Sequence, residues 1–400
     1  MHEINLLIPG PTPLPPTVLQ AMNRPMTNHR GPLFGRIMAE TLAGLHDVFI
    51  TRNDIIPLVC SGTGGLEASI VNFLSPGDRV LSVSNGHFCE RYAEIAERYG
   101  ARVDRVSAEW GRHVPPAAIA DRLGADVKRE YRAVLVTQSE TSTGVHNNVA
   151  AVHAVLGDHP ALLMVDAISS LGAIPLRTDD WRVDVVITGS QKALMSPPGM
   201  AFLSVSDRAW AAAERSTTPR YYFDLRRART EVHAPIPSTP FTSAITVGYA
   251  VHEALRLIRE EGLEHVFGRH RRMARMVRAG VRGMGLETVA EEAHAVDTVT
   301  AVRLPEGADA KAVLTHARER YGVLFGRGIG RLQPTVVRIG HLGYTQPEML
   351  LSGLEVLGGT LRDLGHPVSA EAGLAAARGE LQHVHDDDLT ADVARRRGVR

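Results

Sequence analysis

The chain has 400 residues, of which 44% are hydrophobic, and its 44 Lys and Arg residues balance 44 Asp and Glu residues. This length suits one large and one small domain with a sizeable core, and a formal net charge of zero gives no electrostatic footprint for nucleic acid or membrane binding. Only two cysteines occur, Cys60 and Cys89, which argues against a disulfide framework or a cysteine-based metal site and makes a reducing cytoplasm the default compartment.

Residues 1–20 predict an extended N-terminal arm, because LLIPGPTPLPP is rich in proline. The segment lacks a basic stretch followed by a long apolar run, so neither a signal peptide nor a membrane span is expected. The 18 histidines show no His-x-x-His or Cys/His ligand spacing. HRGP and HVHDDD are interpreted as surface histidines, and no metal site is expected.

Residues 21–245 predict a large α/β domain. Apolar residues at helical spacing indicate a helix over Leu33–Ile50. Continuous apolar strands that alternate with amphipathic helices are typical of a mostly parallel sheet covered on both faces. The expected strands are Ile55–Val59, Val80–Val83, Val103–Val106, Val134–Thr137, Leu162–Asp166, Val185–Thr188 and Ala201–Val205, and the helices between them include Leu66–Leu74, Cys89–Tyr99 and Pro115–Gly124.

The pattern changes near Thr242, and residues 246–366 predict a smaller α+β domain. Residues 367–400 are expected to form a C-terminal extension whose last part, from HVHDDD onward, is a charged and frayed tail. The expected elements are helices Ala244–Glu261, Leu263–Met284, Asp309–Arg320 and Pro347–Leu364, and strands Thr298–Leu304 and Val336–Ile339.

The segment Val183–Gly199, VDVVITGSQKALMSPPG, is the most informative part of the sequence. Its apolar run is typical of a buried strand, and Lys192 lies in the small-residue and proline turn beyond it. A lysine amine in a dry site can lose its proton and form Schiff bases with aldehydes. Taken alone, a solvated lysine in a surface turn is the commoner explanation.

Other strand ends also carry candidate groups, because ligands of open parallel sheets bind beyond the carboxyl ends of the strands. After the first strand, SGTGG leads directly into a helix whose free N–H groups could hold a phosphate, although such a start is also a common cap. Phe88 could lie flat on a planar ring or cover the core. The hydroxyl cluster SETSTGV suits a ligand oxygen or an ordinary turn.

Two charged residues close or occupy apolar strands. Asp166 is costly at the end of a buried strand unless a cation such as a protonated pyridine nitrogen pairs with it, or unless it caps the following turn. Arg338 lies inside VVRIGHLG and requires an acidic partner, either a protein carboxylate or a substrate carboxylate.

Taken together and in this order, these motifs resemble the class V aminotransferases of the fold-type I pyridoxal-phosphate (PLP) superfamily, and most closely the alanine/serine–glyoxylate aminotransferases. The resemblance runs from about Leu6 to Leu364. The motifs are LLIPGPTPLPP, SGTGGLEA, NGHFCERYAEIAERYGARV, SETSTGV, VDAISSLG, TGSQKALMSPPG, TPFT and VRIGHLGY.

The resemblance implies a role for each matching residue, and a homodimer with shared active sites. Lys192 is implied as the Schiff-base lysine, and Asp166 as the partner of the pyridine nitrogen. Arg338 is implied to hold the substrate α-carboxylate, and Gly10 and His87 are assigned to the substrate side. The cofactor-binding set is completed by Thr63, Gly64, Gly65, Phe88, Thr141, Ile168, Gln191 and, from the neighbouring subunit, Thr242.

The sequence departs from the family pattern at His87, at His146 and Asn148 in GVHNNV, and at Ser243 after TPFT. The favoured function is ping-pong transfer of an amino group from alanine, serine or a similar amino acid to glyoxylate or pyruvate. One alternative is lyase or desulfurase chemistry on the same fold, although neither cysteine lies in a suitable loop. A non-catalytic PLP-binding protein is the other alternative.

Overall fold

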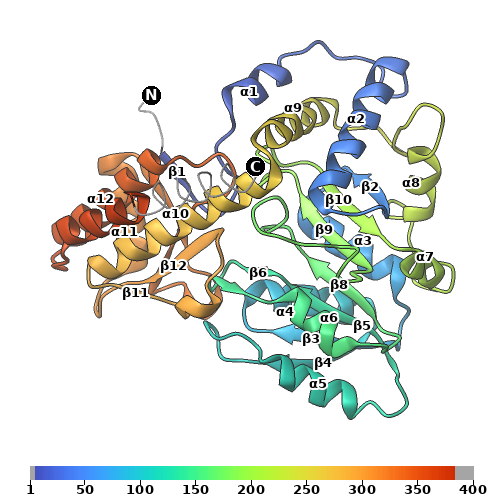
Figure 1. Ribbon diagram of the computed structural model, residues 1–400, viewed down its shortest axis with the longest axis horizontal. Helices are drawn as coiled ribbons and strands as arrows, with labels where there is room; N and C mark the ends of the chain where they lie inside the picture. The colour runs from blue at the N-terminus through green and yellow to red at the C-terminus, as the bar shows by residue number, and fades with distance from the viewer. Residues whose placement is uncertain (1–4, 383–400) are drawn as a thin grey trace, which may run out of the picture.

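Two β-sheets organise the chain, one of seven strands and one of five. The computed structural model describes residues 5–382, and the predicted charged tail at residues 383–400 lies outside them. Figure 1 shows the small sheet and its helices on one side of the molecule and the large sheet on the other.

The seven-stranded sheet has the order β2-β10-β9-β8-β5-β3-β4. Strand β10 runs antiparallel to both of its neighbours, and the other neighbouring pairs are parallel. The prediction of a mostly parallel sheet is therefore confirmed. The strands are β2 (Asp54–Leu58), β3 (Arg79–Ser84), β4 (Arg102–Ser107), β5 (Tyr131–Thr137), β8 (Leu162–Asp166), β9 (Val185–Gly189) and β10 (Ala201–Val205).

Helices cover both faces of this sheet, as the continuous apolar strands predict. Val134 and Val136 of β5 belong to one buried cluster and Ala133 and Leu135 to the other, because successive side chains of a strand point to opposite faces. One face packs on α2 (Pro32–Phe49), α5 (Pro116–Gly124), α6 (Val149–Leu156) and α9 (Ile245–Glu261). The other packs on α3 (Gly62–Phe73), α4 (His87–Arg98), α7 (Asp207–Ala213) and α8 (Leu225–Val232).

The five-stranded sheet takes in the start of the described chain. Its order is β1-β13-β14-β12-β11, and β1 pairs in parallel with β13. The predicted arm thus contributes a short strand, seen in Figure 1 among the elements of the small domain. The strands are β1 (Asn5–Leu7), β11 (Glu287–Thr288), β12 (Val299–Arg303), β13 (Val323–Arg327) and β14 (Val336–Gly340), and the cluster beside them includes α10 (Leu263–Gly283), α11 (Ala310–Tyr321) and α12 (Pro347–Asp363).

Besides these two sheets, β6 (Ser139–Glu140) and β7 (Val145–His146) form a two-stranded antiparallel sheet. Helix α9, which begins at the predicted domain boundary, packs against α1 (Pro16–Met22) and α2 of the large body. Residues 370–382 are helical, and Ala377 joins the buried cluster of the small sheet. The elements not yet given are the 3₁₀ helices η1 (Glu292–His294) and η2 (Gly330–Leu332).

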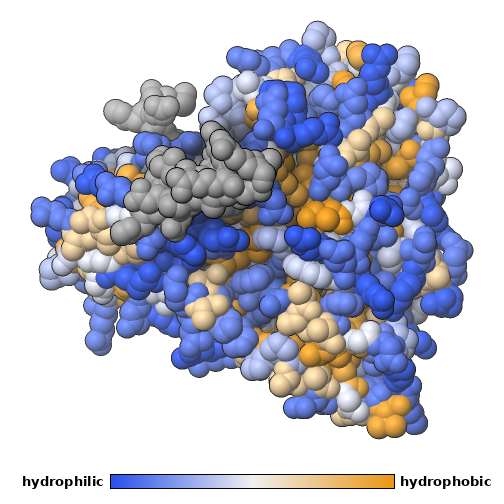
Figure 2. Space-filling model, viewed as in Figure 1, coloured by the Kyte–Doolittle hydropathy of each residue, from blue (hydrophilic) through white to orange (hydrophobic). Residues whose placement is uncertain are grey.

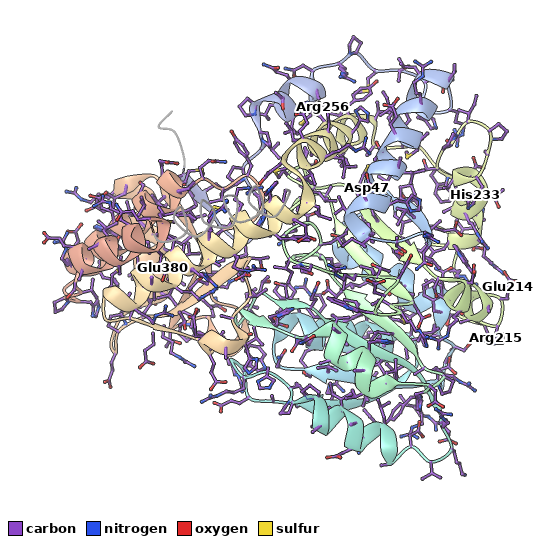
Figure 3. The ribbon with its side chains drawn as sticks, viewed as in Figure 1. Asp47, Glu214, Arg215, His233, Arg256 and Glu380 are labelled. Carbon is purple, nitrogen blue, oxygen red and sulfur yellow. The ribbon has the colours of Figure 1, made fainter. Side chains whose placement is uncertain are left out.

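Hydrophilic residues cover most of the visible face of the molecule (Figure 2). Charged side chains such as Asp47, Arg215 and Arg256 lie on the outside (Figure 3). Among the described residues, none of the helices has the length and apolar character needed to cross a membrane. The cytoplasmic location stays a prediction.

Candidate active site

A cavity of about 130 Å³ lies at the carboxyl ends of β8 and β9, and the first turn of α3 lines one side of it. Six residues that the sequence singles out line it together, although they are far apart in the chain: Thr63, Phe88, Asp166, Ile168, Gln191 and Lys192. The other lining residues are Ser61, Gly62, Leu66, Arg91, Ser139 and Ser169. This arrangement is the one expected for a ligand site of an open parallel sheet.

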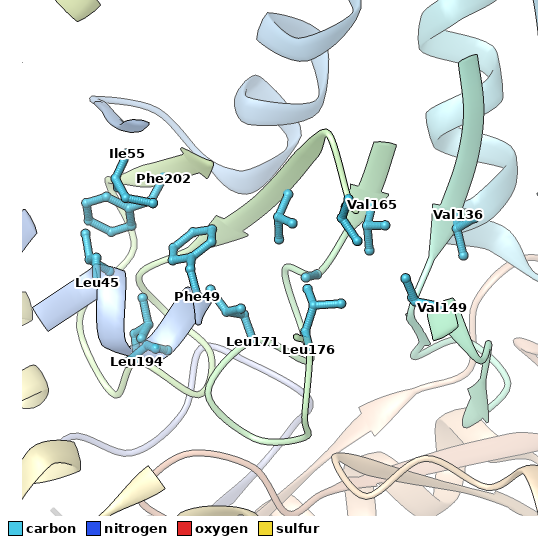
Figure 4. Packing of buried hydrophobic residues seen from close by; sticks show 14 of the residues in the cluster. Leu45, Phe49, Ile55, Val136, Val149, Val165, Leu171, Leu176, Leu194 and Phe202 are labelled. Carbon is cyan, nitrogen blue, oxygen red and sulfur yellow. The ribbon is translucent and has the colours of Figure 1, made fainter. Parts of the chain in front are cut away.

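Lys192 enters the cavity from the turn that follows β9. Its Nζ donates a hydrogen bond to the carbonyl oxygen of Pro9, in the arm beyond β1. Burial and then the charge of Arg338 lower the pKa of the lysine to about 8. The turn is anchored by Leu194, which packs in the same core as Leu45 (Figure 4). The amine therefore has the fixed position and the weakened proton affinity of a nucleophile.

Gly10 passes so close to this lysine that a side chain at position 10 would displace the end of the Lys192 side chain. A Cβ built on Gly10 would lie 2.5 Å from Cδ of Lys192 and 2.7 Å from its Nζ. The backbone φ of Gly10 is +104°, in a region that favours glycine. The structure thus brings Gly10, which the sequence assigns to the substrate side, against the amine of Lys192.

Asp166 ends strand β8 and is buried. One carboxylate oxygen accepts a hydrogen bond of 2.9 Å from the backbone N–H of Ile168, and the other a longer one from Thr137 Oγ1. Burial raises the pKa of Asp166 to about 7, and the nearby charge of Glu140 acts in the same direction. A cation in the cavity would offset that burial cost and keep the carboxylate ionised.

The start of α3 forms one wall of the cavity. Ser61 caps this helix by accepting a hydrogen bond from Gly64 N, and Thr63 lies in the first turn, where backbone N–H groups have no intrahelical partner. Gly65, in contrast, faces the sheet, where an added Cβ would lie 2.8 Å from Cγ2 of Ile187. The wall suits an anion, and Gly65 serves the packing of the helix against the sheet.

Phe88 is positioned by a buried carboxylate that the sequence did not single out. Oε2 of Glu140 accepts hydrogen bonds of 2.9 Å from the backbone N–H groups of Phe88 and Cys89, at the start of α4. Its Oε1 accepts two more from Ser142. Gly86 allows this approach, since a Cβ there would lie 2.3 Å from the Glu140 side chain. Glu140 thus joins the SETSTGV loop to the helix that carries Phe88.

Arg91 adds a positive charge to the same wall. Its guanidinium lies 4.8 Å from the ring centroid of Phe88, and its Nη1 is 3.5 Å from the hydroxyl of Thr63. His87 stands beside it, with Nε2 3.3 Å from Nη2 of Arg91, and burial lowers the pKa of this histidine. The signal for Arg91 in the sequence was its position three residues after Phe88 on one helix face.

Arg338 is buried in β14, with 7% of its surface exposed. Its Nε donates to the carbonyl oxygen of Arg327 over 2.8 Å, and its Nη1 to that of Thr141 over 3.0 Å. Burial lowers the pKa of this guanidinium to about 10. In the described part of the chain no carboxylate lies within ion-pair distance of it. The guanidinium is therefore held in place by neutral carbonyl oxygens, and its positive charge can pair with an anion.

Thr242 lies apart from these residues and is exposed on the single chain. Neither cysteine is poised as a thiolate, because burial raises the pKa of Cys60 to about 12 and that of Cys89 well above its ordinary value. The exposed position of Thr242 bears on its implied role in a second subunit. The raised pKa values of the two cysteines bear on the desulfurase alternative, which needs a nucleophilic thiolate.

The cavity fits a phosphorylated cationic ring such as PLP. Asp166 is buried and forms no ion pair within residues 5–382, the first turn of α3 offers N–H groups that have no intrahelical partner, and Lys192 presents an amine. Among the described residues no hydrogen bond engages the side-chain amide of Gln191, so its NH₂ group can donate to a phosphate and its buried oxygen can accept from a ligand donor. These residues would hold the aldehyde, the phosphate and the ring nitrogen of PLP.

Comparisons with known proteins agree over most of the chain. A family model described as aminotransferase class-V matches residues 4–343. The L-aspartate–glyoxylate aminotransferase of Paracoccus denitrificans is 40% identical over 93% of this chain and 95% of its own. The serine–glyoxylate aminotransferase of Arabidopsis thaliana is 35% identical over 95% of each chain. The crystal structure of a ureidoglycine–glyoxylate aminotransferase from Bacillus subtilis has a TM-score of 0.89 at 31% identity, covering 96% of this chain and 99% of that one.

Proposed function

The chain belongs to the class-V aminotransferase family, and from this membership we propose that it moves an amino group from a small amino acid to glyoxylate or pyruvate. It is a PLP-dependent aminotransferase by family. The proposed reaction is ping-pong: one amino acid leaves as its 2-oxo acid, and a second 2-oxo acid then receives the amino group.

Lys192 and Asp166 carry the chemistry in this proposal. Bound PLP supplies an electron-withdrawing ring that stabilises negative charge at the substrate Cα. With a pKa near 8, the Nζ of Lys192 is partly neutral at physiological pH, so it can act as the base that takes the proton from Cα. The Asp166 carboxylate would keep the proton on the ring nitrogen.

The remaining cavity residues position the cofactor. The first turn of α3, Thr63, the Gln191 amide and the Arg91 guanidinium would bind the phosphate. Phe88 and Ile168 would pack against the ring and exclude water from it.

The buried guanidinium of Arg338 is the observation that carries the substrate class. It has no ion-pair partner among the described residues, and its unused N–H groups fit one α-carboxylate. Arg91 is already engaged beside Thr63 and Phe88, so a second clamp for a dicarboxylate is not available from it. Arg30, another candidate for a second clamp, is exposed and donates to the carbonyl oxygen of Pro240. The site therefore favours small monocarboxylate donors, against the L-aspartate named for the 40% identical relative, and glyoxylate is the acceptor named for all three relatives.

A matrix of amino donors and 2-oxo acids tests this function. Alanine and serine with glyoxylate should give the highest kcat/KM, and aspartate should be a poor donor. Lys192→Ala should lose both turnover and the absorbance band of lysine-linked PLP. An aspartate preference would overturn the proposed donor class, and release of sulfide from cysteine without a 2-oxo acid would favour the lyase alternative.

We also propose a homodimer in which Thr242 completes the active site of the partner subunit. Several large apolar side chains are exposed in two segments that contact each other, since Arg30 donates to Pro240 O and Gly35 lies close to Ile236. Exposed apolar surface of this kind is typical of an interface. The exposed residues are Leu19, Met26, Leu33, Tyr221, Tyr222 and Ile236.

Mixing two defective variants tests the shared site. Thr242→Ala should weaken PLP binding in its own homodimer, and Lys192→Ala should be inactive. A mixed dimer would contain one site with both residues intact. Unfolding the two variants together and refolding the mixture should therefore restore part of the activity at low PLP. Activity no higher than the sum of the two separate variants, or a monomer in sedimentation velocity, would contradict the proposal.

A further inference from the structure

A second group of coordinating side chains lies away from the active-site cavity, where the large and small bodies meet. His113 belongs to the loop after β4, and Glu291 and His294 lie just before and within η1. One ligand atom of each residue lies within 4.8 Å of the others. The two segments pack closely, since a Cβ built on Gly111 would lie 2.4 Å from the carbonyl oxygen of Val289. Val296, two residues beyond η1, also donates a hydrogen bond of 2.8 Å to the carbonyl oxygen of Gly144 in the SETSTGV loop.

We propose that His113, Glu291 and His294 bind a divalent transition-metal ion of the zinc type. Two imidazole nitrogens and one carboxylate oxygen form a ligand set that Zn²⁺ accepts, with a further position left for water. Mg²⁺ and Ca²⁺ prefer sites made of oxygen ligands alone, so this set selects against them. The site is separate from Lys192, and it does not depend on the proposed reaction.

The two imidazoles are available as ligands. Their rings stack, with centroids 3.4 Å apart and an angle of 29° between the ring planes, so the rings have to turn about their side-chain bonds for one nitrogen of each to point at the same ion. In residues 5–382 no hydrogen bond joins either ring to another protein group. Neutral imidazole is the form that binds a metal.

The carboxylate is also oriented for this purpose. Glu291 forms an ion pair with Arg112, the residue before His113. Both side chains are about half exposed, at 43% and 57%, so the pair contributes little by itself, and one oxygen can stay on Arg112 while the other takes a metal. Such an outer partner orients a metal-binding carboxylate. The next residue, Glu292, is instead engaged by Arg278 and Arg282.

A third histidine lines the adjoining cavity, which measures about 130 Å³ and is formed in part by His113, His146 and His294. His146 lies in β7, next to the SETSTGV loop, and is one of the residues that depart from the family pattern. A metal ion at the cluster would tie the loop after β4 to η1. Gly144 accepts a hydrogen bond from Val296, just beyond η1, and belongs to the same loop as Thr141, whose carbonyl oxygen accepts a hydrogen bond from Arg338. The ion would therefore also help to fix the position of the Arg338 guanidinium.

Calorimetric titration of the PLP-loaded, tag-free, chelator-treated enzyme with Zn²⁺ tests the site. Two further histidines, His383 and His385, lie outside the described residues, so the titration uses a His383→Ala/His385→Ala background. We expect one Zn²⁺ per chain, and no binding of Mg²⁺. His113→Ala and His294→Ala should each weaken Zn²⁺ binding by roughly 100-fold.

The matched control is His252→Ala, because His252 forms an exposed pair with Glu40 at 2.8 Å that resembles one half of the cluster. This control should bind Zn²⁺ as tightly as the background protein. Glu291→Gln keeps the size of the side chain and decides the question if a histidine variant does not fold. Zn²⁺ should raise Tm in the background protein and in Lys192→Ala, but not in the cluster variants. Equal Zn²⁺ affinity in the cluster variants and the background, or equal weakening by His252→Ala, would overturn the proposal.

Discussion

Replacing Gly10 by alanine tests the placement of the lysine amine most directly. The new Cβ would lie 2.5 Å from Cδ, 2.8 Å from Cε and 2.7 Å from Nζ of Lys192. Because carbon atoms in contact prefer a separation of about 3.5 Å or more, the lysine side chain has to move by about 1 Å. A displacement of about 1 Å at a reacting group costs roughly 100-fold in rate. We therefore expect kcat of Gly10→Ala to fall about 100-fold.

Backbone strain has to be separated from this effect, since φ of Gly10 is +104°. Gly285 supplies the control: its φ is +81°, and no atom lies within 4 Å of the position of an added Cβ. Gly285→Ala should lose about 1–3 kcal/mol of stability from strain but keep its kcat. The assays are steady-state kinetics with saturating PLP and urea unfolding of both variants. If Gly10→Ala keeps kcat within a few-fold of Gly285→Ala, the close approach of Gly10 to the amine is wrong.

Three further predictions concern buried charges. Because burial raises the pKa of Asp166 from 3.8 to about 7, the folded cofactor-free protein keeps a proton that the unfolded chain releases, and stability is lost as the pH rises through this window. The free energy of unfolding of Asp166→Asn, measured in urea relative to the parent, should therefore rise by up to about 4 kcal/mol between pH 3.8 and pH 7. A difference between variant and parent that does not change with pH would contradict this. Glu140→Gln should lose about 1–3 kcal/mol and bind PLP more weakly, because Gln places an NH₂ group against backbone donors. Unchanged unfolding and PLP titration would refute that role. Arg338→Lys should raise KM for the amino donor about tenfold or more with a smaller effect on kcat, since it loses the planar fork; an unchanged KM would exclude the carboxylate role.

The strands of the large sheet and their bounds were predictable to within a few residues, because most of them are apolar runs covered on both faces; the edge strand β4, RVDRVS, is the exception. The groups at the ends of those runs, Lys192 and Asp166, could be identified for the same reason. Neither segment alone predicts that Lys192 and Asp166 lie in one cavity. That prediction depended on the order of the motifs along the chain, which carries the resemblance to the family.

The small sheet was less predictable. Strand β1 has three residues beside a proline-rich stretch, and β13 is five residues long with a glycine near its end, so neither carries a clear period. Their pairing is a tertiary contact. Glu140 was overlooked because its function is to accept hydrogen bonds from another segment, and no local pattern reports that. The same limit applies to His113 and His294, whose stacking depends on the docking of two distant segments.

The pairing of β1 with β13 has a consequence for biosynthesis. During translation Asn5 leaves the ribosome long before Val323, its partner in the ladder, exists. The segment that reaches Lys192 through Pro9 and Gly10 cannot be fixed from that side until the small sheet has been made. A nascent chain that has completed only the large sheet therefore carries an unfinished catalytic pocket, and its maturation waits for the last third of the polypeptide.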